Sequence, residues 1–559
     1  MTQALDRRRT FIVATVAVGA TALVLGPSLR PGYTLSYDLV FVPHLPWSIQ
    51  LLGVGGGPPR AVPSDALVSL ASTLVPGWVV EKVVLVATLA LAGLGAGRLV
   101  GRRNGRALAP CAAALAYIWN PYVFERLVIG HWTLLIGYAA LPWAVGSVRR
   151  SRGVAWPTLA LASVAAAVGG AQASVVFVPV VLAVLIACPA RHDPRWPDVG
   201  RFAILAAVLN APWWVPGVLG SGTVRLDPAS VAAFAPRADT ALGTVGSLLS
   251  LGGVWNAEVA PPGRGSLVVA AASALLVVVA TAGLARSWRT LPHWRTGLVV
   301  AAGLDVVLVL LLSGPLQSGF GHVVTHVPGA GLLRDSQKLV GPLALVWAVG
   351  LAGAVRAALD LRAPAATRRA AALVVVALPV AVVPALMWGC SGRLGSVWYP
   401  PAWTAASGPV AASRADGALL VLPWGAYRRF DWNADRVVLD PAPRWFGGVV
   451  FFDDRLAVGP VTVGPETGVG AAITAAPDPS AQVAAAGAHG ASVVVTELPS
   501  ATAPDLTGEQ LDVVDVTPTG PLPSGLPVFP VLFADVLALV VAVVSWPVLW
   551  LRGRSRLLP

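Results

Sequence analysis

Ionisable side chains are rare in this chain, so those beside long apolar stretches are the first candidates for chemistry. Only 12% of the 559 residues are charged, whereas 56% are hydrophobic. A charge at a membrane edge is costly unless it is paired or used, so each such residue marks a candidate site. Three stretches carry these residues: 36–47 with Tyr37, Asp38 and His44, 120–132 with Glu125, Arg126 and His131, and 333–338 with Arg334, Asp335 and Lys338.

These residue types suit the transfer of a phosphate-linked group to a hydroxyl. A carboxylate such as Asp38 can act as a general base on the hydroxyl. Arg334 and Lys338 are four residues apart, and on one helix face they would repel each other unless an anion such as a lipid phosphate lay between them. Each observation has a plainer interpretation: Asp38 as a loop or capping residue, Glu125 and Arg126 as an interfacial ion pair, and the two cations as residues that reach the lipid headgroups.

Aromatic residues near the C-terminal end form a further group of candidates. They alternate with polar residues, and flat rings of this kind pack against the apolar C–H faces of sugars. The alternative is that they form the core of a small domain. The residues are Trp424, Tyr427, Trp432 and Trp445.

The elements that position these residues are predominantly membrane helices. Crossing about 30 Å of hydrocarbon takes about 20 helical residues. A mean hydropathy of +0.73 with so few charges excludes a soluble enzyme. We therefore predict an all-α polytopic membrane protein with about twelve transmembrane helices, at 10–28, 78–98, 106–123, 132–148, 154–170, 172–189, 200–220, 265–285, 296–314, 338–357, 369–389 and 529–551.

The positions of the arginines predict the orientation of these helices. Of 39 basic residues, 23 lie in seven short clusters, at 7–9, 98–106, 149–152, 191–201, 286–295, 356–369 and 552–556. With twelve spans all seven clusters fall on one side, which is cytoplasmic by the positive-inside rule. The prediction is a multi-pass plasma-membrane protein with both termini in the cytoplasm. Because this sorting accounts for most of the net charge of +12, no nucleic-acid partner is expected.

The opposite, exoplasmic face carries the long connections. These are loops at 29–77, 221–264 and 315–337, a short turn at 121–131 and a block at 390–528. Within the block, β-like segments at 418–422, 436–439, 448–452 and 492–496 and a helix cap at 478–480 predict a small α/β domain. We divide the chain into a transmembrane module (1–389), this exoplasmic α/β domain (390–528), and a last helix with a cytoplasmic tail (529–559).

With these elements in place, the chain resembles the GT-C superfamily of integral-membrane glycosyltransferases. The resemblance rests on a first span followed by an early aspartate, on many further spans and on a terminal exoplasmic domain. The stretches 120–131, with its Asn-Pro-Tyr and Gly-His motifs, and 333–338 are similar to the N-terminal membrane parts of large envelope arabinofuranosyltransferases of high-GC bacteria.

The resemblance implies a polyprenyl-phosphate sugar as donor and an envelope glycan or glycolipid as acceptor, both met at the membrane lipid surface. Asp38 matches the acidic residue of the family's first loop and would be the general base, and Arg334 with Lys338 match its donor-phosphate position. The first loop has a single early aspartate instead of an acidic pair, so no metal ligand is assigned and a divalent cation, Mg²⁺ or Mn²⁺, stays open. The remaining pocket residues would be Tyr37, His44, Glu125, Arg126, His131 and Asp335.

The competing interpretation is a non-catalytic protein, either a transporter or an assembly factor for lipid-linked envelope polysaccharide. A transporter would place functional polar residues near the middle of the bilayer, whereas these candidates gather on one face. An assembly factor would tolerate loss of Asp38. Asp65, in a proline-rich part of the same loop, has no counterpart in the family pattern and is expected to be replaceable.

Overall fold

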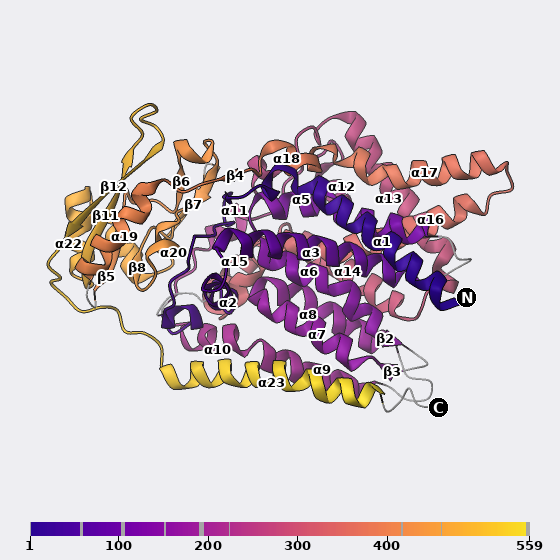
Figure 1. The fold of residues 1–559 in the computed structure, drawn as a ribbon, viewed down its shortest axis with the longest axis horizontal. Helices are drawn as coiled ribbons and strands as arrows, with labels where there is room; N and C mark the ends of the chain where they lie inside the picture. The colour runs from indigo at the N-terminus through magenta and orange to yellow at the C-terminus, as the bar shows by residue number, and fades with distance from the viewer. Residues whose placement is uncertain are drawn as a thin grey trace.

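A bundle of apolar helices carries a smaller sheet domain at one end (Figure 1). The computed structural model describes residues 2–55, 60–101, 107–149, 153–188, 195–222, 224–414, 417–459 and 461–554. Helix α1 (Thr2–Leu25) begins, and α23 (Val528–Arg554) ends, at the end of the bundle away from the sheet domain. Parts of the arginine clusters lie outside the described residues, namely Arg102, Arg103, Arg106, Arg150, Arg152, Arg191 and Arg556.

Seven helical segments among the described residues are long and apolar enough to cross a membrane. They are Thr10–Leu29 with most of α1, α3 (Gly77–Leu99), α8 (Gly170–Ala187), Leu267–Thr290 with α13 (Leu267–Ser287), α14 (Trp294–Leu312), Ser336–Leu359 with α16 (Gly341–Leu359), and α17 (Ala365–Val382). An eighth results if α9 (Trp196–Leu209) and α10 (Ala211–Leu219), which meet at 67°, form one span.

The other predicted spans are helical but differ in length from the prediction. The stretch 106–123 is wrong as a single span, because α4 (Leu108–Ile118) ends before Asn120 and α5 (Pro121–Val128) starts a new direction. Asn120 caps α5 by accepting a hydrogen bond from the Val123 amide at 3.0 Å. The helices α6 (Trp132–Ser147) and α7 (Trp156–Val168) have 16 and 13 residues. The described apolar part of α23, Val528–Val544, is also short and packs along α7, α9 and α10.

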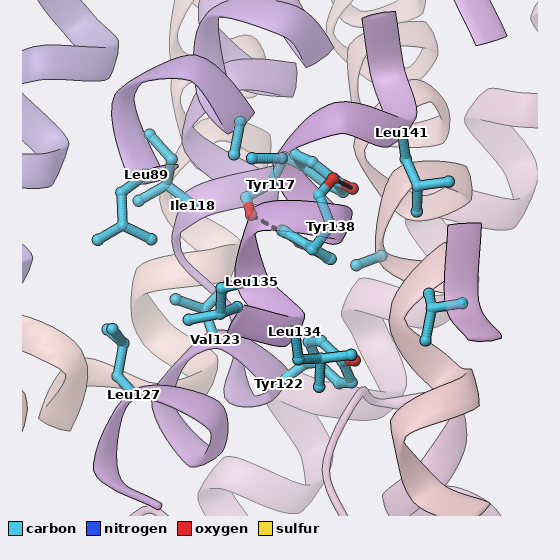
Figure 2. Packing of buried hydrophobic residues seen from close by; sticks show 14 of the residues in the cluster. Leu89, Tyr117, Ile118, Tyr122, Val123, Leu127, Leu134, Leu135, Tyr138 and Leu141 are labelled. Carbon is cyan, nitrogen blue, oxygen red and sulfur yellow. Dashed lines mark hydrogen bonds between the residues drawn. The ribbon is translucent and has the colours of Figure 1, made fainter. Parts of the chain in front are cut away.

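Three tyrosines, one each from α4, α5 and α6, stack in the core. The rings of Tyr117 and Tyr138 stack with their centroids 4.0 Å apart, and Tyr122 stacks on Tyr138 at 5.5 Å (Figure 2). The Tyr122 hydroxyl donates a hydrogen bond to the carbonyl of Lys338 at 2.8 Å. This packing fixes α5 against the start of α16, so that two of the candidate stretches lie side by side.

The domain that the sequence predicted to be exoplasmic is built on a mixed four-stranded sheet, as the α/β prediction required. Its order is β12 (Thr507–Asp515), β11 (Ala491–Pro499), β5 (Ala418–Leu422) and β8 (Val450–Phe451), with β11, β5 and β8 parallel and β12 antiparallel. The predicted cap is present, since Asp478 accepts a hydrogen bond from the Ala481 amide at the start of α22 (Pro479–Gly487). The helices α19 (Pro401–Arg414) and α21 (Gly468–Thr474) complete the domain.

One predicted strand lies outside this sheet and joins the domain to the first loop. β7 (Val437–Leu439) pairs with β6 (Tyr427–Arg429). Tyr37 of the first loop extends this pair, because its amide donates to the Val437 carbonyl at 2.7 Å and its carbonyl accepts from the Leu439 amide at 2.9 Å. A second contact pairs β1 (Tyr33–Thr34) with β4 (Ser396–Val397). The domain is therefore held directly over the loop that carries Asp38.

Candidate functional site

Asp38 lies where the first loop, the turn between α5 and α6, and the exoplasmic domain meet. Its amide donates a hydrogen bond to the Ile129 carbonyl at 3.1 Å. Gly130 in that turn has a φ of +83°, and a Cβ there would come within 2.0 Å of the Leu39 nitrogen and 2.6 Å of the Asp38 carbonyl carbon. Only glycine permits this approach, so Gly130 determines where Asp38 sits.

Both carboxylate oxygens of Asp38 have partners. The Tyr427 hydroxyl donates to Oδ1 at 2.7 Å, and His131 Nε2 lies 3.4 Å from Oδ2. Burial raises the pKa of Asp38, but the hydrogen bonds from His131 and Tyr427 and the charge of Arg60 bring that pKa below its ordinary value. The side chain is 39% exposed. Asp38 is thus an ionised carboxylate at neutral pH that an incoming hydroxyl can still reach.

The other nitrogen of His131 faces a buried arginine. Arg126 Nη1 lies 2.9 Å from His131 Nδ1, and a guanidinium only donates hydrogen bonds. Nδ1 therefore accepts, which leaves the ring proton on Nε2, directed at Asp38. Arg126 also donates to Asp335 Oδ2 at 2.8 Å and to Gln337, whose amide nitrogen donates to Glu125 at 2.9 Å.

This network joins the three stretches chosen from the sequence, but its ion pair differs from the one that the sequence suggested. Arg126 pairs with Asp335, which lies 209 residues along the chain, and not with its neighbour Glu125. Burial raises the pKa of Asp335, whereas Arg126 is the strongest of the charges that bring it below its ordinary value. The simple interfacial pair of Glu125 and Arg126 is therefore wrong, because both side chains are buried in the protein.

The two cations of the third stretch do not share a helix face. Arg334 lies between two short 3₁₀ helices, η5 (Ala330–Leu333) and η6 (Ser336–Val340), so the helical spacing assumed for the pair is broken. Lys338 is buried, and its Nζ donates to Gln172 Oε1 at 2.8 Å. The Arg334 guanidinium lies over the Phe234 ring at 4.9 Å and pairs with Glu466 at 2.7 Å.

Two residues of the first loop are held by structural partners. His44 Nδ1 is 3.3 Å from the Ser72 carbonyl at the end of α2 (Ser64–Ser72). Asp65, which was expected to be replaceable, is buried and pairs with Arg444 of the exoplasmic domain at 2.9 Å. The proline-rich loop folds into the helix α2 here, so Asp65 has a structural partner that its sequence context did not suggest.

The aromatic residues of the exoplasmic domain divide into core and cleft. Trp432 and Trp445 pack against Tyr399 at centroid distances of 5.2 and 4.8 Å, and Trp424 Nε1 donates to Thr474 at 3.0 Å. Trp432 and Trp445 thus belong to an aromatic cluster, and all three tryptophans are half-buried, so their binding of sugar stays a prediction. Tyr427 instead lines a cleft of about 400 Å³, together with Pro423, Arg428, Arg429, Val437, Asp505 and Thr507.

Two residues at the site were missed by the sequence analysis. Glu466 of the exoplasmic domain accepts a hydrogen bond from Arg60 of the first loop at 2.7 Å and one from Arg334, also at 2.7 Å. Arg60 and Glu466 are 406 residues apart, and neither belongs to a motif. No signal in a single sequence connects them.

Comparison with known proteins bears on the fold. No family model and no curated protein matches the sequence. The structure is similar to the cryo-EM structure of arabinofuranosyltransferase AftD from mycobacteria, with a TM-score of 0.54 and 18% identity over 88% of this chain. The chain shares the fold of an arabinofuranosyltransferase. A mutant form of AftD matches with a TM-score of 0.53 at the same identity and coverage of this chain.

The match to AftD extends over 35% of that enzyme's chain, so this protein spans about a third of its length. At 18% identity the likeness concerns the arrangement of helices and domain. It confirms the fold that the sequence predicted, a bundle of long apolar helices that carries a small α/β domain. Donor, acceptor and catalytic residues have to be argued from this chain's own side chains.

The side chains around Asp38 do not fit the divalent cation that the sequence left open. Within the described residues, no group of three or more His, Cys, Asp or Glu side chains is placed to hold a metal ion. Both oxygens of Asp38 are engaged by Tyr427 and His131. We therefore derive no catalytic step through Mg²⁺ or Mn²⁺.

Proposed function

We propose that this protein is a glycosyltransferase of the plasma membrane that moves a sugar from a polyprenyl-phosphate donor to an envelope glycan or glycolipid on the exoplasmic face. The observation that carries the proposal is Asp38, an ionised and partly exposed carboxylate at the meeting point of two domains. Its surroundings orient it without neutralising it, as a general base requires. The AftD-like fold supports this class of reaction.

In the proposed reaction, Asp38 takes the proton of the acceptor hydroxyl as that oxygen attacks the anomeric carbon. The bond between this carbon and the phosphate oxygen breaks, and polyprenyl phosphate leaves with the bonding electrons. Attack from the side opposite the leaving phosphate inverts the configuration of the sugar. Arg334 stabilises the negative charge on the phosphate. We assign Lys338 a structural role instead, since it is buried against Gln172.

The acceptor approaches along the cleft beside Tyr427 in this proposal. The cleft volume of about 400 Å³ and its mixed polar and apolar lining suit a short glycan segment. Tyr427 lines the cleft and donates a hydrogen bond to Asp38, so the cleft and the proposed base share this residue. His131 and Arg126 are positioning residues that act through Asp38.

The test is turnover by the purified protein in lipid nanodiscs. Polyprenyl-phosphate arabinose and mannose with a radiolabelled sugar are offered together with an envelope glycan acceptor. We expect label to move to the acceptor and polyprenyl phosphate to accumulate in equal amount. Movement of intact donor across proteoliposomes without consumption indicates the transporter, and neither transfer nor movement indicates the assembly factor.

A further inference from the structure

The described residues contain an anion site that the exoplasmic domain fills with its own carboxylate. Glu466 receives one hydrogen bond from Arg60 Nη2 and one from Arg334 Nη1, each at 2.7 Å and each to a different carboxylate oxygen. The Glu466 side chain is 6% exposed, whereas Arg60 is 51% and Arg334 is 23% exposed. The carboxylate therefore lies inside, between two guanidinium groups that solvent still reaches.

This site adjoins Asp38. Arg334 directly precedes Asp335, which Arg126 and His131 connect to Asp38 through successive contacts. The positive charge of Arg60 also helps to lower the pKa of Asp38. In the proposed reaction, Asp38 activates the attacking hydroxyl and Arg334 stabilises the leaving phosphate. That phosphate therefore lies close to the position that the Glu466 carboxylate occupies.

We infer that Arg60 and Arg334 together bind the donor phosphate and that Glu466 holds their place until the donor displaces it. The inference rests on the proposed function. A sugar phosphodiester carries one negative charge, as a carboxylate does, and guanidinium groups bind both anions through paired N–H groups. The exchange of one for the other leaves the net charge of the site unchanged.

The backbone around Glu466 is held by hydrogen bonds, so the exchange we infer takes place by rotation of the Glu466 side chain. The Glu466 carbonyl accepts from the Arg225 amide at 2.9 Å, and the Glu466 amide donates to Asp454 Oδ2 at 3.1 Å. The domain stays docked through β7 and β4 while the carboxylate leaves. Glu466 thus acts as a tethered competitor that lowers the affinity of the site for phosphate.

The decisive experiment measures the Kd of polyprenyl phosphate for the full chain in nanodiscs. Glu466→Gln removes the competing charge but keeps the shape of the side chain. We expect it to tighten binding about tenfold or more, because the two arginines are released from a charged partner.

Arg60→Ala and Arg334→Ala are each expected to weaken binding about tenfold or more. Glu509→Gln, an exposed residue on β12 of the same domain, is the matched control and is expected to keep the wild-type Kd.

If Glu466→Gln binds polyprenyl phosphate no more tightly than wild type, the inference is overturned. If that variant is also less stable to heat, Arg60, Arg334 and Glu466 form a structural ion-pair cluster. If wild type transfers sugar while Glu466→Gln binds no more tightly, the proposed function stands and only the place-holding role fails. If Glu466→Gln binds more tightly but no variant transfers sugar, the anion site stands and the glycosyltransferase proposal fails.

Discussion

At the scale of single residues, a chain of hydrogen bonds with a defined direction runs from Arg126 through His131 to Asp38. Arginine fixes that direction, because it donates to His131 Nδ1 and thereby commits the ring proton to Nε2. His131 consequently supports the charged form of Asp38 and does not compete for the proton of the acceptor. The same arginine is anchored by Asp335, so residues from three distant stretches hold one carboxylate in place.

Removing His131 is expected to change the pH dependence of transfer. The pKa of Asp38 in the folded protein lies below its ordinary value, so the base is ionised above that pKa and activity falls only as pH drops through it. His131→Ala removes a hydrogen bond to the ionised form, which raises this pKa. The acid limb of kcat/KM should therefore move to higher pH. The control is His322→Ala, which changes an exposed histidine and should leave the pH dependence of kcat/KM unchanged. An acid limb that stays at the wild-type pH in His131→Ala would contradict the hydrogen-bond chain.

The sequence was sufficient to select Asp38, His131 and Arg126 but not to pair them. Pairing by proximity along the chain joined Glu125 to Arg126, whereas the folded chain brings Asp335 to Arg126. Arg60 and Glu466 were not found at all, because their significance arises only when the exoplasmic domain docks on the first loop. Long-range pairs of this kind leave no mark on local residue patterns.

At the scale of elements, the turn between α5 and α6 is what brings His131 to Asp38. The turn exists because Asn120 caps a new helix at Pro121 and because Gly130 adopts a positive φ against the first loop. The predicted span 106–123 continued past the break between α4 and α5, because apolar residues follow Asn120 as well as precede it. By contrast, β5, β11 and the cap of α22 were predictable, since strand and cap signals there are local.

Substitution of Gly130 tests this arrangement. Gly130→Ala adds a Cβ that would lie 2.0 Å from the Leu39 nitrogen, so either the turn or the Asp38 segment has to move. We expect a loss of about 3 kcal/mol or more in stability and loss of transfer. Gly329→Ala is the matched control, because Gly329 has the same φ of +83° with nothing within 4 Å. Gly329→Ala should lower the stability only by the strain of a left-handed backbone conformation at alanine, about 1–2 kcal/mol. Equal thermal shifts for both variants would contradict the close approach.

At the scale of the whole molecule, the sheet domain packs on the first loop and covers part of the candidate site. The chain leaves the carboxyl end of β5 toward Tyr427 and that of β8 toward Glu466, and both side chains reach the first loop. Ligands of α/β sheets bind at this edge of the strands. The start of α1 and the end of α23 lie at the opposite end of the bundle (Figure 1). The architecture therefore places substrate chemistry and the arginine-rich ends on different sides.

The predicted orientation can be tested by reporter fusions. Fusions after Arg289 and Arg368 should report a cytoplasmic location, because the positive-inside rule retains these clusters there. A fusion near Pro465, one residue before Glu466, should report an exoplasmic location. A cytoplasmic signal at Pro465 would contradict the proposed topology, and with it the access of the site to an exoplasmic acceptor.

The central claim is that Asp38 is the general base, and the rate of sugar transfer by the purified Asp38→Asn variant tests it most directly. A general base contributes about 10²–10⁴-fold, so kcat should fall by that factor while the Kd for polyprenyl phosphate and the folded structure are kept. Asp512→Asn, an exposed aspartate on β12, should retain the wild-type rate. Transfer by Asp38→Asn at the wild-type rate would contradict the account.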